Sequence, residues 1–312
     1  MKSEFNPCGV TKIGDPYVLH ASDGKYYLYA TTDKLQGLGF HVHSSTDLKH
    51  WKFEGTCYQL TEKSFGYKDC WAPEVVEYNG KFIMHYTARW KKNHSLRLGV
   101  AVSSSPLGPF EEVYDNRPMF DPGYASIDGD VFIDDDGRKY LYYSRDCCDN
   151  VHTNGEHQSH IYCIELSDDL LSVVGEPHFI FGPTEEYENI ENLFNEGCYK
   201  WNEGPFALKI NGEIHIMYSA NFFATKHYCI CGAKGKHPFG PFVKYKHPIA
   251  THIEGKVSGP GHNSVFFDDK GNMYCAYHVH TDINHPGSDR QLFIDRLRYE
   301  DGELKMDITY ND

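Results

Sequence analysis

The stretch Glu203-Gly204-Pro205-Phe206 opens the hairpin that decides the fold of this chain. It leads into a strand-like run, turns at Asn211-Gly212 and returns as Ile214-His215-Ile216-Met217-Tyr218. Asn-Gly between two runs of β-forming residues is a strong signal for a tight hairpin. The stretch therefore predicts two antiparallel strands, with a carboxylate at the entrance of the first.

The chain contains this pattern five times. Each copy has a short apolar strand, a turn with glycine and a second strand rich in tyrosine and large apolar residues. The copies begin at residues 15, 72, 128, 203 and 262, which are 57, 56, 75 and 59 residues apart. Repeats of short strands at this spacing suit four-stranded propeller blades. The copies are DPYVLHASDGKYYLYATTD from Asp15, APEVVEYNGKFIMHYTAR from Ala72, DGDVFIDDDGRKYLYYSR from Asp128, EGPFALKINGEIHIMYSAN from Glu203 and HNSVFFDDKGNMYCAYHVH from His262.

We therefore predict an all-β protein, a five-bladed β-propeller whose four-stranded antiparallel blades surround a central channel. The repeats fill nearly the whole chain, so we expect one domain over residues 1–312. The long third interval indicates an insertion, which we place within residues 146–200. Residues 291–304, QLFIDRLRYEDGEL, are expected to form the last hairpin of the fifth blade.

The first residues of the copies are Asp15, Ala72, Asp128, Glu203 and His262. In a propeller the innermost strands lie side by side, so we expect these positions to be equivalent and to converge at one end of the channel. Like charges placed together repel and shift one another's pKa, which packing alone does not require. The pattern favours a functional site, although polar residues can also mark the solvent-exposed ends of strands.

The charge of the chain bears on its partners. It has 30 basic and 44 acidic residues, a formal net charge of −14. Such a surface repels phosphate backbones and anionic lipids, which argues against nucleic acid or a membrane as the main partner. No apolar run approaches the roughly 20 residues of a transmembrane helix. The first residues, MKSEFNPCGV, lack the apolar core of a secretory signal, so we expect a cytoplasmic protein.

Several other features have structural interpretations. Trp71 is as suited to packing within a blade as to stacking on a sugar ring. Residues 134–137, Asp-Asp-Asp-Gly, coincide with the turn of the other copies and lack the ligand pattern of a calcium loop. His278 and His280 alternate as in a strand, which favours packing over a metal site. The acidic run in the insertion is expected to be solvated; it contains Glu185, Glu186, Glu188 and Glu191.

Three acids around one mouth indicate hydrolysis of a glycosidic bond. This reaction needs one carboxylic acid to protonate the leaving oxygen and one carboxylate to activate water or attack the sugar. A third acid can keep the pKa of the proton donor high by repulsion.

The same residues resemble glycoside hydrolase family 43, in the order of that family and over nearly the whole chain. The resemblance implies a five-bladed propeller and hydrolysis with inversion. The motifs that carry it are Gly14-Asp15-Pro16, Trp71-Ala72-Pro73-Glu74, Ser126-Ile127-Asp128, Glu203-Gly204-Pro205 and Gly261-His262.

The resemblance also implies roles for individual residues. Asp15 would be the general base that acts on water, Asp128 would modulate pKa and orient the acid, and Glu203 would be the general acid. His262 is similar to a histidine that often faces a calcium or sodium ion in the channel through waters. Arg290 is similar to an arginine that reaches substrate hydroxyls, with a surface salt bridge as the alternative. Trp71 is a candidate for substrate binding. Inversion requires the two catalytic carboxyls to lie roughly 6.5–9.5 Å apart.

The resemblance implies a pentose-containing oligosaccharide as substrate. We favour an exo-acting α-L-arabinofuranosidase on arabinoxylan-type oligosaccharides, because the chain ends before the additional C-terminal domain of many family β-xylosidases. A β-xylosidase and an endo-arabinanase are the alternatives. Five-bladed fructan and sucrose hydrolases fit poorly, because Asp146 is followed by Cys147 and Glu203 by Gly204. From another class, a non-catalytic sugar-binding propeller stays open.

Overall fold

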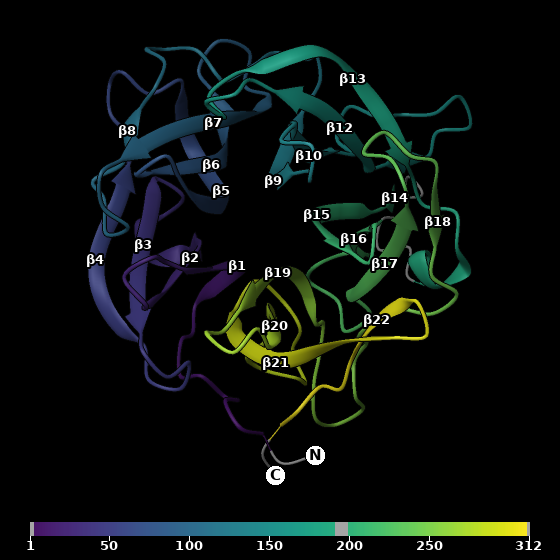
Figure 1. Cartoon of the computed structure of the whole chain (residues 1–312). Coiled ribbons are helices and arrows are strands. Elements are labelled where there is room, and N and C mark those ends of the chain that lie inside the picture. The colour runs from purple at the N-terminus through teal and green to yellow at the C-terminus, as the bar shows by residue number, and fades with distance from the viewer. Residues whose placement is uncertain (1–2, 191–198, 311–312) are drawn as a thin grey trace.

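The computed structural model describes residues 3–190 and 199–310. In this part of the chain five four-stranded antiparallel sheets stand in a ring, and its first and last described residues lie beside the fifth sheet (Figure 1). The first strand of each sheet faces the centre of the ring and the last lies outermost. The prediction of a five-bladed propeller is confirmed.

The blades follow the order of the chain. Blade one contains β1 (Ile13–His20), β2 (Tyr26–Thr32), β3 (Gly39–Ser45) and β4 (Lys52–Gln59). Blade two contains β5 (Gly66–Tyr78), β6 (Lys81–Trp90), β7 (Leu96–Ser103) and β8 (Glu111–Glu112). Blade three contains β9 (Ser126–Ile133), β10 (Lys139–Arg145), β12 (His160–Leu166) and β13 (Val173–Phe181). Blade four contains β15 (Asn202–Ile210), β16 (Glu213–Ala220), β17 (Cys229–Gly235) and β18 (Phe242–Lys244). Blade five contains β19 (Gly261–Phe267), β20 (Met273–His280), β21 (Arg290–Glu300) and β22 (Glu303–Met306).

The predicted hairpins and the last hairpin, β21–β22, are all present. In each blade the turn between the first two strands contains a glycine with positive φ, which such tight turns favour. These glycines are Gly24, Gly80, Gly137, Gly212 and Gly271. The two short 3-10 helices are η1 (Asp33–Leu35) and η2 (Glu186–Glu188). Within residues 3–190 and 199–310, no helix has the length and apolar character needed to cross a bilayer.

The hydrophobic core lies between the blades. Five large clusters of buried side chains each join two neighbouring blades, including the last and the first. Tyrosines supply much of the buried area; Tyr29, Tyr86, Tyr142, Tyr218 and Tyr277 are fully buried. Because every blade packs on two others, the ring holds its innermost strands in fixed positions.

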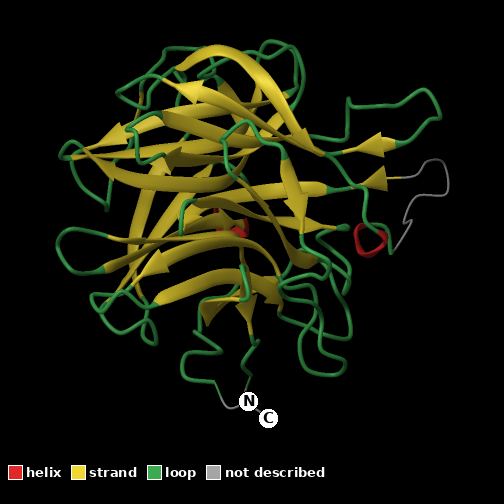
Figure 2. Cartoon of the chain, turned by 45° about the vertical axis from the view of Figure 1, so that its right-hand side comes forward, coloured by secondary structure: helices red, strands yellow, loops and turns green. Residues whose placement is uncertain are grey.

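The expected insertion divides into two segments that flank the outer half of blade three. One lies between β10 and β12, and the other follows β13. The short strands β11 (His157–Gln158) and β14 (Tyr199–Lys200), one from each segment, pair in parallel outside the blades. Figure 2 shows this part projecting from the side of the ring. Glu191 lies outside the described residues.

Candidate active site

The backbone of each innermost strand has a kink, and the candidate residues lie at or next to it. Each innermost strand has a residue with left-handed backbone at this kink, with φ of 53° at Asp15, 43° at Ala72, 56° at Asp128, 56° at Gly204 and 46° at His262. The pairing with the second strand of the blade shifts register at the same place. Such shifts are β-bulges, which re-aim side chains and are common beside active sites.

One repeated hydrogen bond links the five kinks around the ring. The backbone N–H of the kinked residue donates to a side chain on the second strand of the preceding blade. At the closure between blades five and one, the acceptor is Nδ1 of His278, 3.1 Å from the nitrogen of Asp15. The other acceptors are hydroxyls: Thr31 for Ala72 at 2.8 Å, Thr87 for Asp128 at 3.1 Å, Ser144 for Gly204 at 3.2 Å and Ser219 for His262 at 2.7 Å.

This bond shows that Glu203 is not equivalent to Asp15, so that part of the prediction was wrong by one residue. The kinked residue of blade four is Gly204, and Glu203 stands one position earlier. A Cβ on residue 204 would lie 3.0 Å from Nδ1 of His262, and its φ is positive, so glycine is favoured there. The neighbouring residue supplies the carboxylate instead. In the other blades the position of Glu203 is occupied by Gly14, Trp71, Ile127 and Gly261.

Two of these positions are glycines, and each is covered by a side chain from elsewhere in the fold. A Cβ on Gly14 would lie 2.0 Å from Cζ of Arg290, and a Cβ on Gly261 would lie 2.1 Å from the ring of Tyr228. Atoms cannot approach so closely, so the guanidinium and the phenol ring require glycine beneath them. Each of these two side chains also contacts a predicted catalytic carboxyl group: Arg290 contacts Asp15, and Tyr228 contacts Glu203.

Asp15 is a largely buried carboxylate among cationic and hydrogen-bonding groups. Its Oδ1 accepts from Nη1 of Arg290 at 3.0 Å, and its Oδ2 accepts from the Thr31 hydroxyl at 2.6 Å. Nδ1 of His262 and Nδ1 of His278 lie 3.3 and 3.6 Å from Oδ1. Burial alone would raise the pKa of Asp15, but Arg290, the two imidazoles and Thr31 together hold it well below its ordinary value. Asp15 is therefore ionised at neutral pH.

Glu203 has the opposite environment. Its Oε1 accepts from the Tyr228 hydroxyl at 2.9 Å. Burial raises the pKa of Glu203 to about 8; the Tyr228 hydrogen bond opposes this rise, and the nearby carboxylates of Asp146 and Asp15 add to it. Glu203 is therefore largely protonated at neutral pH, whereas Asp15 is ionised.

The third predicted acid, Asp128, lies next to the backbone that carries Glu203. Its Oδ2 accepts from the backbone N–H of Gly204 at 3.2 Å, so its carboxylate holds the residue that follows Glu203. Burial raises the pKa of Asp128 to about 7, while His262 lowers it and the carboxylates of Glu203 and Asp15 raise it. Asp128 is thus placed both to orient Glu203 and to disfavour a second negative charge there.

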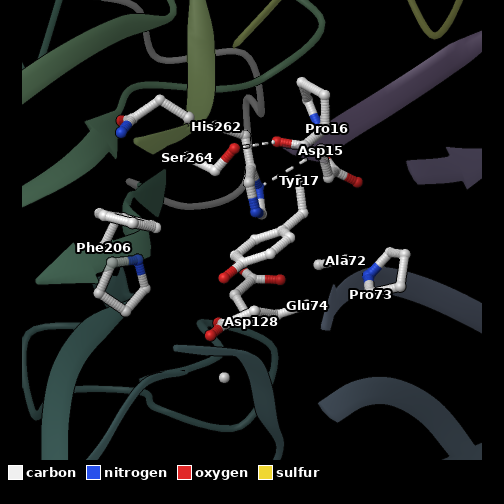
Figure 3. Close-up of a pocket in the computed structure, with 13 residues that line it drawn as sticks. Asp15, Pro16, Tyr17, Ala72, Pro73, Glu74, Asp128, Phe206, His262 and Ser264 are labelled. Carbon is white, nitrogen blue, oxygen red and sulfur yellow. Dashed lines mark hydrogen bonds and ion pairs between the residues drawn. The ribbon is translucent and has the colours of Figure 1, made fainter. Parts of the chain in front are cut away.

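A cavity with an empty volume of about 300 Å³ lies in the centre of the ring and is lined by Asp15, Asp128 and His262 among others. Figure 3 shows the ring of Tyr17 extending through it from the side of Asp15 toward Glu74. The rings of Tyr17 and Phe206 are 6.4 Å apart. Glu74, which stands two residues further along its strand than Ala72, lines the same cavity as Asp15 and Asp128.

The deeper carboxylates, Glu74 and Asp130, form a hydrogen-bonded pair. Oε1 of Glu74 accepts from the N–H of Val131 at 2.9 Å, and Oδ2 of Asp130 accepts from the N–H of Ala207 at 2.7 Å. Each therefore links its blade to the next. Burial raises both pKa values, that of Asp130 to about 7, so the pair retains a proton into the neutral range.

The structure places the other predicted residues as follows. Arg290 is buried against Asp15, which excludes the alternative of a surface salt bridge. Trp71 is half-buried beside a small cluster of Leu96, Ala125 and Ile127, so contact of its indole with a sugar stays a prediction.

The calcium or sodium ion also stays a prediction. Among residues 3–190 and 199–310, no group of three or more histidine, cysteine, aspartate or glutamate side chains is arranged to hold a metal ion. Nδ1 of His262 faces Asp15, which leaves only its Nε2 for an ion. The described side chains therefore do not fit a directly ligated metal.

Sequence reasoning missed Tyr228 and Thr31 and treated His278 as a packing residue. Tyr228 lies in the loop before β17, outside the repeated hairpin, so no repeat marks it. Thr31 and His278 could have been found by aligning the ends of the second strands, where the other copies have Thr87, Ser144 and Ser219.

The acidic run of the insertion is not simply solvated, contrary to the sequence prediction. Both carboxylate oxygens of Glu188 accept from Nζ of Lys244, at 2.6 and 2.7 Å, and both side chains are buried. Lys244 also donates to the side chain of Asn202 at 2.9 Å. The ion pair fastens the insertion to β18, and Asn202, which also donates to Glu188 at 3.1 Å, links both to the start of β15, next to Glu203.

The chain is similar in sequence and in fold to known glycoside hydrolases. A relative from Aspergillus niger, a β-D-galactofuranosidase, is 28% identical over 303 residues, which cover 92% of this chain and 80% of the relative. A xylosidase/arabinosidase from Bacteroides ovatus is 26% identical over 294 residues, 85% of each chain. A crystal structure of a thermostable family-43 glycoside hydrolase matches with a TM-score of 0.90 and 43% identity, and covers 97% of this chain and 96% of that chain.

The fold and these relatives define the chain as a glycoside hydrolase. The family model for glycosyl hydrolases family 43 matches residues 5–304, and the chain belongs to that family.

Proposed function

We propose that the protein is an inverting, exo-acting α-L-arabinofuranosidase that removes terminal arabinofuranosyl residues from arabinoxylan-type oligosaccharides. One observation carries the mechanism: two carboxyl groups at one mouth have opposite protonation, because Arg290 and two histidines surround Asp15 whereas burial and neighbouring acids act on Glu203. Inverting hydrolysis needs one ionised and one protonated carboxyl group on opposite sides of the bond.

In this mechanism Asp15 takes a proton from a water molecule as the water oxygen bonds to the anomeric carbon. Glu203 gives its proton to the glycosidic oxygen as the bond between that oxygen and the anomeric carbon breaks. The products are a sugar of inverted anomeric configuration and the shortened oligosaccharide. Asp128 orients Glu203 through Gly204 and opposes a negative charge on it before substrate binds.

The furanoside preference is supported by the names of the relatives. One is a β-D-galactofuranosidase, and β-D-galactofuranose has the ring stereochemistry of α-L-arabinofuranose with a longer exocyclic chain. The xylosidase/arabinosidase is named for both pentoses, which makes a β-xylosidase the second candidate.

The test compares 4-nitrophenyl α-L-arabinofuranoside, β-D-xyloside and β-D-galactofuranoside, together with arabino-oligosaccharides and a Glu203→Ala variant. We expect the arabinofuranoside to have the highest kcat/KM and the variant to lose hydrolysis of the oligosaccharides. Preference for the xyloside would keep the mechanism and overturn the substrate. Binding of pentose oligosaccharides without hydrolysis by the wild type would favour a sugar-binding propeller.

A further inference from the structure

Tyr228 is a side chain at the mouth to which neither the repeat nor the proposed reaction gives a role. It is almost completely buried, and its hydroxyl donates to Oε1 of Glu203 at 2.9 Å. A phenol that donates to one oxygen of a carboxylic acid occupies that oxygen as an acceptor. The acid proton is then favoured on the other oxygen, Oε2.

Two contacts fix the ring of Tyr228 in this position. One face stacks on the imidazole of His278, with ring centroids 5.5 Å apart and planes 7° from parallel. The ring edge lies over Gly261, where any Cβ would be 2.1 Å from its carbon atoms. His278 in turn accepts the backbone N–H of Asp15. Tyr228 is thus held by the side of the mouth that carries Asp15 and reaches across to Glu203.

We propose that Tyr228 is a positioning residue for the proton donor: it holds Oε1 of Glu203, keeps the transferable proton on Oε2 and stabilises the carboxylate that remains after transfer. This inference rests on the proposed role of Glu203 as the general acid. The expected consequence is specific to the acid half of the reaction. Water activation at Asp15 does not use the Tyr228 hydroxyl.

The test is the Tyr228→Phe variant, which keeps the ring, its stack on His278 and its place over Gly261. A hydrogen bond from a neutral donor favours the charged form of a carboxyl group, so its loss raises the pKa of Glu203. We expect the alkaline limb of the kcat/KM profile to move up by about one pH unit. We also expect at least a tenfold loss on arabino-oligosaccharides, and little loss on 2,4-dinitrophenyl α-L-arabinofuranoside, whose leaving group needs no proton.

Tyr58→Phe is the matched control, because the buried Tyr58 hydroxyl donates to Oε1 of Glu112 at 2.6 Å in the outer part of the ring. It removes the same kind of bond and should leave the pH limb in place. A second variant, Gly261→Ala, keeps Tyr228 but displaces its ring, and should reproduce the dependence on the leaving group.

Glu203→Gln separates this inference from the proposed function. If that variant loses oligosaccharide hydrolysis but retains the dinitrophenyl substrate, Glu203 is the acid. An unchanged alkaline limb and an equal loss on both substrates in Tyr228→Phe would then overturn the role of Tyr228 alone. If Glu203→Gln shows no dependence on the leaving group, the proposed function itself fails.

Discussion

Asp15 and Glu203 both lie at the mouth of the propeller, mostly buried, yet their surroundings differ in kind. Around Asp15 the fold places an arginine, two imidazoles and a hydroxyl. Around Glu203 it places a neutral phenol and the carboxylates of Asp146 and Asp15, with Arg290 as a weaker influence. Burial pushes the pKa of both groups upward, and only Asp15 has enough positive charge nearby to reverse the direction.

The difference shows that neighbouring groups, and not the extent of burial, decide which of the two carboxyl groups is ionised. It also shows where those neighbours come from. Arg290 is the first residue of β21, and Tyr228 lies in the loop before β17. Their side chains cover Gly14 and Gly261, which leave room for them because they have no side chain. The repeated hairpins supply the scaffold, the acids and some of their neighbours, and Arg290 and Tyr228, which lie outside the repeated hairpins, add the strongest positive charge at Asp15 and the hydrogen bond at Glu203.

The largest expected effect comes from removing either carboxyl. Asp15→Asn should lower kcat/KM by about 10²–10⁴-fold on every substrate, because every substrate is attacked by the water molecule that Asp15 activates. Glu203→Gln should show a loss of that size only on substrates with a poor leaving group. Steady-state kinetics on oligosaccharide and dinitrophenyl substrates distinguish the two. Glu112→Gln, a carboxyl outside the mouth, serves as the control, and equal behaviour of the two catalytic variants would contradict the comparison.

An intermediate effect is expected when the surroundings of Asp15 are made more like those of Glu203. Asp15 must be ionised to act as a base, so activity is lost as the pH falls through its pKa. Arg290→Met removes the strongest stabilising charge and should raise that pKa, which moves the acid limb of kcat/KM upward by about one to three pH units. Arg290→Lys keeps the charge and should move the limb less. An unmoved limb in Arg290→Met would contradict the assignment of Arg290 as the main group that keeps Asp15 ionised.

The smallest expected effect concerns the deeper pair, Glu74 and Asp130. The unfolded chain releases these protons near pH 4, whereas the folded pair keeps one into the neutral range, so the free energy of unfolding falls as the pH rises between about 4 and about 7. In Glu74→Gln the amide donates to Asp130 at any pH. The decline should therefore be shallower by up to about 1.4 kcal/mol per pH unit.

Denaturant unfolding at pH 5 and pH 7 measures this decline, with Glu77→Gln on the same strand as the control. If the pair carries no shared proton, the wild type and Glu74→Gln will have the same pH dependence of the free energy of unfolding.

The sequence predicted the propeller, the hairpins and the convergence of Asp15, Asp128 and Glu203, because hydrophobic periodicity and turn chemistry are local and repeat. It did not predict the one-residue offset of Glu203, because a β-bulge appears only in the pairing of two strands. It also could not place Tyr228, which lies between repeats, or the partner of Glu188, Lys244, which is 56 residues away. Such contacts depend on how loops and insertions pack in three dimensions.

The most direct test of the central claim is the pH dependence of kcat/KM in the wild type and in Glu203→Gln, measured on 2,4-dinitrophenyl α-L-arabinofuranoside and on an arabino-oligosaccharide. For the wild type on the oligosaccharide, we predict an acid limb below the ordinary range of an aspartate and an alkaline limb near pH 8. On the dinitrophenyl substrate, whose leaving group needs no proton, the wild type and Glu203→Gln should share the acid limb, and neither should show the alkaline limb. If the residual hydrolysis of the oligosaccharide by Glu203→Gln keeps the alkaline limb near pH 8, another group donates the proton.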